Sequence, residues 1–136
     1  MLAKINEFLR KGLDFAFETT LSSKSFFNTI KRAKENGYEV TLLFFWLDSV
    51  ELAIERVKTR VAVGGHDIPE KVIRRRYYSE IKNLFVLYMP VCDYWMITNN
   101  STPNLELIAE GNYETINKIE NNRIFELMKS LKNDNK

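Results

Sequence analysis

The ten residues Tyr38–Leu47, with the sequence YEVTLLFFWL, constrain the fold of this chain more than any other segment. Their unbroken apolar stretch predicts a buried strand that is covered on both faces, which is typical of parallel sheets. Helical spacing of apolar residues flanks this strand, before Gly37 and after Asp48. We therefore expect an α/β fold with a mainly parallel sheet and helices on both faces.

Apolar spacing and stop signals divide the rest of the chain into further elements. In chain order we expect a helix ending at Gly12, a buried strand over Leu13–Phe17, a helix from Ser22 or Ser23 to Gly37, the strand Tyr38–Leu47, a helix after a capping box at Asp48 and Glu51, a helix from Pro69 to about Met89, a strand over Cys92–Thr98, a hairpin over Leu105–Ile119 turning at Gly111-Asn112, and a helix over Asn121–Leu131. These elements predict one domain over residues 1–136, with residues 105–136 as a hairpin and helix appendage.

Composition narrows the possible partners and compartments. Twenty Lys and Arg against eighteen Asp and Glu give a net charge of +2, which is too small to favour nucleic-acid or membrane binding by bulk charge. The single cysteine, Cys92, cannot form an internal disulfide, and no apolar run reaches the roughly 18 residues of a membrane span. We expect a cytoplasmic protein with no nucleic-acid or membrane partner. Cys92 and the aromatic residues Phe44, Phe45 and Trp46 are expected in the core.

A strongly basic segment lies between Arg56 and Arg76, where seven basic and two acidic residues give a local charge of +5. Guanidinium groups on two adjacent helices can converge on a multiply charged anion, because each planar fork binds two phosphate oxygens. Gly64-Gly65 between the helices would supply the freedom of a phosphate-covering lid. The alternative is a solvated helical surface. The chain has a single histidine, His66, so a metal site built from several histidines is excluded. His66 itself either contacts a phosphate or is exposed.

A second candidate site follows the expected strand Leu13–Phe17. Glu18, Thr19 and Thr20 would stand beyond its carboxyl end, where open parallel sheets bind ligands. A carboxylate there could accept hydrogen bonds from substrate hydroxyls. In the alternative interpretation, Thr20 or Ser22 caps the next helix and Glu18 favours its dipole.

The ordered segments FAFETTL, GYEVTLLFFWL, ERVKTRV, GGHDIP and VIRRRYYSEIKNL resemble the zeta-toxin-like P-loop kinases. The resemblance runs from about Ile5 to Glu110 and implies transfer of the γ-phosphate of ATP to a small molecule, UDP-N-acetylglucosamine in the best-known members. It implies ATP and Mg²⁺ as cofactors. It further implies two sets of site residues. The substrate-binding residues are Glu18, Thr19 and Thr20. The residues of a phosphate-binding lid are Arg56, Arg60, His66, Arg75 and Arg76.

One departure from the family is large, because the chain contains no GxxxxGK[ST] phosphate loop. The family's catalytic aspartate would also precede the part that matches. We therefore expect a truncated domain without the P-loop strand, with little or no kinase turnover and without tight binding of ATP and Mg²⁺ by this chain alone. Unpaired strand edges predict a homodimer or a missing amino-terminal segment as partner. The alternative function is a non-catalytic anion-binding or nucleotide-binding module.

Overall fold

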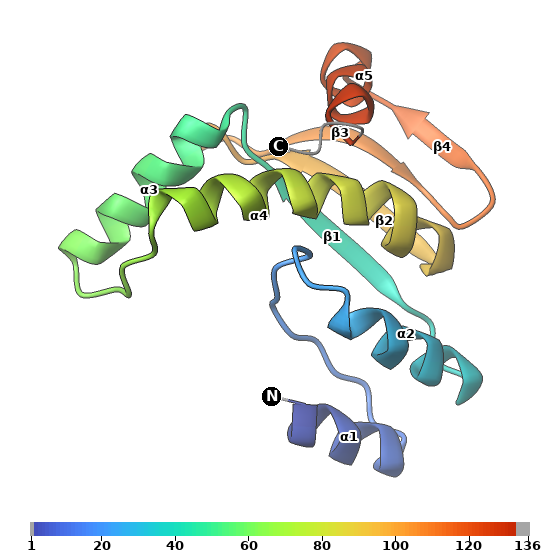
Figure 1. Ribbon diagram of the computed structural model, residues 1–136. Helices are drawn as coiled ribbons and strands as arrows, with labels where there is room; N and C mark the ends of the chain where they lie inside the picture. Colours follow the sequence, from blue (N-terminus) through green and yellow to red (C-terminus); the bar gives the residue numbers. More distant parts are fainter. Residues whose placement is uncertain (1, 133–136) are drawn as a thin grey trace.

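The computed structural model describes residues 2–132 and shows five helices and four strands in this part of the chain (Figure 1). In chain order they are α1 (Leu2–Lys11), α2 (Ser25–Glu35), β1 (Thr41–Trp46), α3 (Val50–Ala62), α4 (Glu70–Asn83), β2 (Tyr94–Asn99), β3 (Glu106–Gly111), β4 (Ile116–Ile119) and α5 (Asn122–Leu131), with a π-helical turn (Leu84–Tyr88) and a 3₁₀ turn (Met89–Val91) after α4. None of the described helices is long and apolar enough to cross a membrane.

The four strands form one mixed sheet in the order β1-β2-β3-β4. The strands β1 and β2 are parallel, with Thr41 opposite Tyr94, whereas β2 pairs with β3 and β3 with β4 in antiparallel fashion. The α/β class is confirmed, but the prediction of a mainly parallel sheet was wrong. The reason is that two strands come from the carboxyl-terminal hairpin, and a short turn can join only antiparallel neighbours.

The carboxyl-terminal hairpin and helix, predicted over residues 105–136, join the same sheet and apolar core as the preceding elements. The strand β3 lies directly beside β2, and α5 buries Ile124, Phe125 and Met128 in the same apolar cluster as the central strands. The Phe125 ring stacks on Trp95 at a centroid distance of 6.5 Å. Burial of these large side chains means that α5 stabilises the sheet on which it packs.

The segment Leu13–Phe17 is not a strand, in contrast to the prediction. Residues 13–20 have no regular secondary structure, and Leu13 and Phe17 are 47% and 37% exposed. A strand forms only where a neighbour accepts and donates its backbone hydrogen bonds, and no described strand pairs with this segment. This segment therefore has the apolar composition of a strand, but no described strand lies beside it to pair with its backbone.

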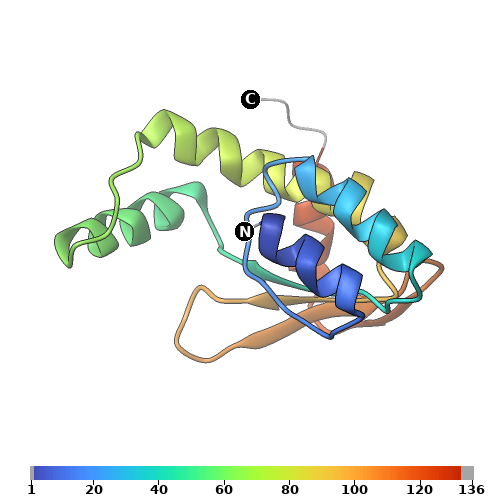
Figure 2. The same cartoon turned by 90° about the horizontal axis from the view of Figure 1, so that it is seen from below.

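One face of β1 is buried and the other is open. Phe44 and Trp46 lie in the core as predicted, but Leu43 and Phe45 are 56% and 52% exposed. Figure 2 shows the helices gathered on one side of the sheet. The prediction that helices cover both faces was therefore wrong for β1, and Phe45 is not a core residue.

The helices α3 and α4 form an antiparallel hairpin, in which α4 crosses over β1 and α3 extends beyond the end of that strand (Figure 1). The cap of α3 is Ser49, whose side chain accepts a hydrogen bond from the N–H of Leu52 at 3.1 Å, so the capping box predicted at Asp48 was displaced by one residue. The hydroxyl of Tyr77 donates to the Leu47 carbonyl at 2.7 Å and fixes α4 on the end of β1. Cys92 is fully buried, as predicted, and burial raises the pKa of its thiol to about 12.

Candidate functional site

A groove of about 2220 Å³ runs beside the edge of β1 with which no described strand pairs. The whole of β1 lines it, together with residues 12 and 14–21 on one side and parts of α3 and α4 on the other. Pockets for small ligands typically have roughly 300–1000 Å³. The groove therefore has room for more than one small ligand.

The wall formed by α3 and α4 carries Arg56, Arg60 and Arg76, and we call it the arginine wall. Arg56 and Arg60 lie one turn apart on α3, and Arg76 comes from α4. Arg56 donates through Nη2 to the Ser101 carbonyl at 3.2 Å. Among residues 2–132, neither Arg60 nor Arg76 takes part in an ion pair, although Arg76 lies close enough to Glu80 to act on its carboxyl group.

Other basic residues of the same segment are used to hold the helical hairpin together. The Nζ of Lys58 lies 3.2 Å from Glu70, and Nη1 of Arg74 lies 3.5 Å from Glu51. These exposed pairs connect α3 with α4, and each contributes at most about 1 kcal/mol. The segment with charge +5 therefore contains structural ion pairs as well as the arginine wall.

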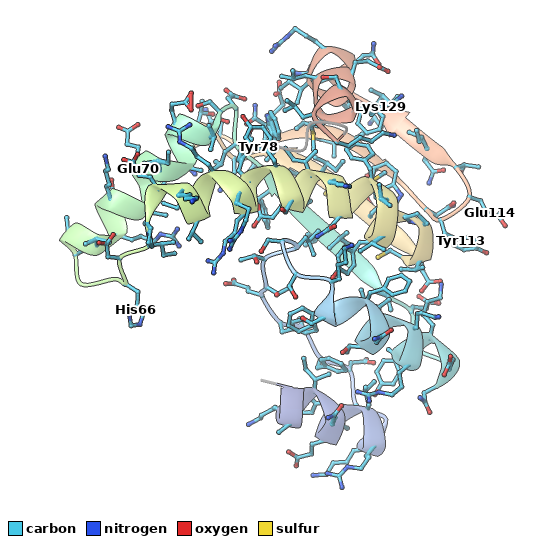
Figure 3. All side chains as sticks on the ribbon, in the orientation of Figure 1. His66, Glu70, Tyr78, Tyr113, Glu114 and Lys129 are labelled. Carbon is cyan, nitrogen blue, oxygen red and sulfur yellow. The ribbon has the colours of Figure 1, made fainter. Side chains whose placement is uncertain are left out.

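Two of the expected lid residues lie outside the groove. Arg75 is exposed on α4 and does not line it. His66 is exposed on the loop that joins α3 to α4, and Figure 3 shows its ring directed away from the body of the protein. The structure therefore does not bring Arg75 and His66 together with the other candidate residues.

Gly64 and Gly65 end α3 in a conformation that requires glycine. Gly64 has a φ of +100° and donates to the Val61 carbonyl at 3.1 Å, while the N–H of Gly65 donates to the Arg60 carbonyl at 2.7 Å. A Cβ at Gly65 would lie 2.8 Å from that carbonyl oxygen. This arrangement is a Schellman-type cap, and it accounts for both glycines without a hinge.

The opposite wall of the groove consists of residues 12 and 14–21, which we call the amino-terminal wall, and it includes Glu18, Thr19 and Thr20. All three side chains are exposed. The Thr20 and Ser22 hydroxyls hydrogen-bond to each other at 2.7 Å. At the start of α2, the N–H of Ser25 donates to the hydroxyl of Ser23. The alternative in which Thr20 or Ser22 caps α2 is therefore wrong.

Side chains from elsewhere in the fold hold the amino-terminal wall in place. The amide of Asn83 donates to the Leu21 carbonyl, and the Tyr88 hydroxyl donates to the Ser23 carbonyl, each at 2.7 Å. The Tyr38 hydroxyl donates to the Leu13 carbonyl at 2.8 Å. A row of aromatic rings with centroids 5.2–6.2 Å apart also joins this wall to α1 and α2 through Phe8, Phe15, Phe17 and Phe26.

Glu80 lines the groove and did not emerge from the sequence as a candidate. It lies one turn after Arg76 on α4. Burial raises the pKa of the Glu80 carboxyl to about 7, although the Arg76 guanidinium acts in the opposite direction. The signal in the sequence is its position seven residues after Ile73, on the face of α4 that is otherwise apolar. Near neutral pH this carboxyl can both donate and accept a hydrogen bond.

The described residues contain no group of three or more His, Cys, Asp or Glu side chains that could hold a metal ion. The carboxyl groups that line the groove are distributed over both of its sides, as with Glu18 and Glu80.

Comparison with known proteins gives a match to the model of the zeta toxin family over residues 3–86. The chain belongs to the zeta toxin family. Membership suggests a kinase-like, nucleotide-binding function, and the matched region contains both walls of the groove. The chain is also 39% identical over 69 residues to an uncharacterized protein of Haemophilus influenzae, an alignment that covers 51% of this chain and 49% of that relative. No solved structure matches the chain.

Proposed function

We propose that the groove binds the polyphosphate of a nucleotide at the arginine wall and a hydroxyl-bearing acceptor at the amino-terminal wall. One observation carries this proposal: Glu18 and Thr20 line the same groove as Arg60 and Arg76, although about forty or more residues separate the two groups in the sequence. A substrate that contacts both walls would lie beside the end of β1, which is the common site of ligand binding in α/β sheets.

The chemistry of each wall fits one part of such a substrate. Guanidinium forks bind phosphate oxygens in pairs and neutralise the charge that develops on a transferred phosphoryl group. The Glu18 carboxylate accepts hydrogen bonds from sugar hydroxyls, and the hydroxyls of Thr19 and Thr20 can donate or accept. Family membership makes ATP, with Mg²⁺, and UDP-N-acetylglucosamine the ligands to test first.

We propose binding with little or no phosphoryl transfer for residues 1–136 alone. These residues contain no GxxxxGK[ST] segment, whose backbone and lysine hold the phosphates in P-loop kinases. A non-catalytic nucleotide-binding module would use the same arginines. Only the appearance of phosphorylated product distinguishes a kinase from such a module.

Calorimetric titration of matched variants tests the assignment of the two walls. We expect Arg76→Ala and Arg60→Ala each to weaken ATP binding about tenfold, as loss of one charged hydrogen-bond donor does. Arg75→Ala is the matched control, because the same charge on the same helix lies outside the groove. Glu18→Gln should weaken UDP-N-acetylglucosamine binding and leave ATP binding unchanged. Equal losses in Arg75→Ala and Arg76→Ala would contradict the proposal, and sugar-nucleotide phosphorylation by the purified chain would contradict the absence of turnover.

A further inference from the structure

Glu80 is a partly buried carboxyl on the wall of the groove. The apolar side chains of Ile73 and Ile81, on the same helix, line the groove with it. Within residues 2–132, its carboxyl takes part in no ion pair and no hydrogen bond. Acidic groups that are removed from water normally have a partner, so this carboxyl is placed to meet a ligand.

Arg76 lies one turn before Glu80 on α4 and lines the same groove. Residues four apart on a helix are neighbours on its surface. Burial raises the pKa of the Glu80 carboxyl to about 7, and the Arg76 guanidinium acts in the opposite direction. The carboxyl therefore gains and loses its charge near neutral pH, beside the guanidinium that the proposed function assigns to a phosphate.

Other titratable and charged side chains share the groove with Glu80. They are Asp14 and Glu18 on the amino-terminal wall, Tyr38 and Glu39 before β1, and Glu55, Arg56 and Arg60 on α3. Tyr77, Tyr88 and Cys92 also line the groove, but burial raises the pKa of each, so all three stay neutral where Glu80 titrates. Arg76 is the charged neighbour that acts on the Glu80 carboxyl.

We propose that the groove binds a phosphate-bearing ligand together with one proton, which Glu80 holds while Arg76 binds the phosphate. An ionised Glu80 attracts the Arg76 guanidinium and repels an anion. A protonated Glu80 does neither, and its O–H can donate a hydrogen bond to a phosphate oxygen. The inference rests on the proposed function and adds its regulation, because the affinity of the arginine wall for phosphate then falls as the pH rises.

The coupling between proton and ligand must be reciprocal. If the protonated groove binds the anion more tightly, then the bound anion raises the pKa of Glu80 further by the same factor. Binding above neutral pH therefore takes a proton from the buffer. A Glu80 that is only structural would change stability with pH but would leave the ligand affinity and the proton balance of binding unchanged.

Calorimetric titration with ATP tests the proposal in the unaltered chain and in Glu80→Gln, whose neutral amide stands in for the protonated acid. The titration of ATP itself is common to both chains, so the ratio of their dissociation constants isolates Glu80. We expect the two chains to bind ATP about equally near pH 6. Near pH 8.5, the unaltered chain should bind about tenfold more weakly than Glu80→Gln.

Glu55→Gln is the matched control, because it removes the same charge from an exposed side chain of the same groove. Its effect on ATP binding should not change between these pH values. A second measurement uses the unaltered chain alone, near pH 8, where the phosphates of ATP are fully ionised. Binding heats in two buffers of different ionisation enthalpy should then show net proton uptake.

Three results would overturn the proposal. The first is a ratio for Glu80→Gln that stays the same across the pH range, and the second is an equal pH-dependent change in Glu55→Gln. The third is binding without proton uptake by the unaltered chain, which decides the matter even if Glu80→Gln fails to fold. If Arg76→Ala still weakens ATP binding and Arg75→Ala does not, these results leave the proposed function standing. Equal binding by those two arginine variants would overturn both.

Discussion

The two walls of the groove differ in how the fold holds them. The arginine wall belongs to helices that pack on β1, where Trp46 is 1% exposed and its ring lies 5.8 Å from that of Tyr77. The amino-terminal wall has no regular secondary structure, and it depends on a few hydrogen bonds from Asn83, Tyr88 and Tyr38. The positions of the arginines are therefore set by the core, whereas the position of Glu18 depends on a few hydrogen bonds and ring contacts from other parts of the chain.

This difference predicts how each wall responds to damage. Loss of a core contact under the arginine wall should unfold the whole chain, because its helices and the sheet share one apolar cluster. Loss of a contact under the amino-terminal wall should release only that segment, as local unfolding does where few apolar contacts are buried. The following substitutions test this contrast.

The largest effect is expected for Trp46→Ala under the arginine wall. Removal of a fully buried tryptophan should lower the free energy of unfolding by about 3–5 kcal/mol, because it leaves a cavity beside Tyr77. Urea denaturation followed by circular dichroism measures this loss. The adjacent Phe45→Ala is the control, since that ring is half-exposed and its removal should cost less than about 1 kcal/mol. Similar losses in the two variants would contradict the burial of β1 on one face only.

A smaller and local effect is expected for Asn83→Ala at the amino-terminal wall. The substitution leaves the buried Leu21 carbonyl without its donor, at a cost of about 1–3 kcal/mol. Hydrogen exchange should accelerate within residues 12–24 and stay unchanged in β2 and β3. Asn36→Ala is the matched control, because its amide also donates to a carbonyl but is exposed. Uniform acceleration through the sheet would show that this wall is not a separate unit.

A pH-dependent effect is expected at Glu80 on the arginine wall. Burial raises the pKa of this carboxyl from 4.5 to about 7, so the folded state binds its proton more tightly than the unfolded state does. Stability should therefore fall as the pH rises from about 4.5 through 7, by an amount on the order of 1 kcal/mol for a partly exposed group. Glu80→Gln should flatten this part of the profile, measured by urea denaturation at each pH. Glu55→Gln, also in the groove, serves as the control, and an unchanged profile in Glu80→Gln would contradict the assignment.

The smallest effect is expected for Lys58→Met, which breaks the exposed ion pair to Glu70 on the far side of the arginine wall. Exposed pairs contribute about 0–1 kcal/mol and are screened by salt. The melting temperature should change by at most a few degrees, and the difference should vanish at 1 M salt. A larger loss, or one that persists in salt, would mean that the ion pairs determine where the arginine wall lies.

Much of the fold could be predicted from local patterns, and part of the site could as well. The helices, the strand at Tyr38–Leu47 and the hairpin near Gly111 follow from apolar spacing and turn residues, all of which act over a few positions. Arg60 and Arg76 were found by their charge, but Arg75 has the same charge and lies outside the groove. Glu80 was missed because its importance comes from burial, which charge and spacing in the sequence do not report.

The sequence by itself determined the helices, the strands β1 to β4 and the family of this protein, because residue type and spacing act locally. Only the tertiary structure decided that no described strand pairs with Leu13–Phe17, that the sheet is mixed, and that one face of β1 and the edge away from β2 are open within the described residues. Strand pairing joins residues far apart in the chain, so its outcome depends on which neighbours reach each edge. The same physical reason made Glu18 and the arginines line one groove.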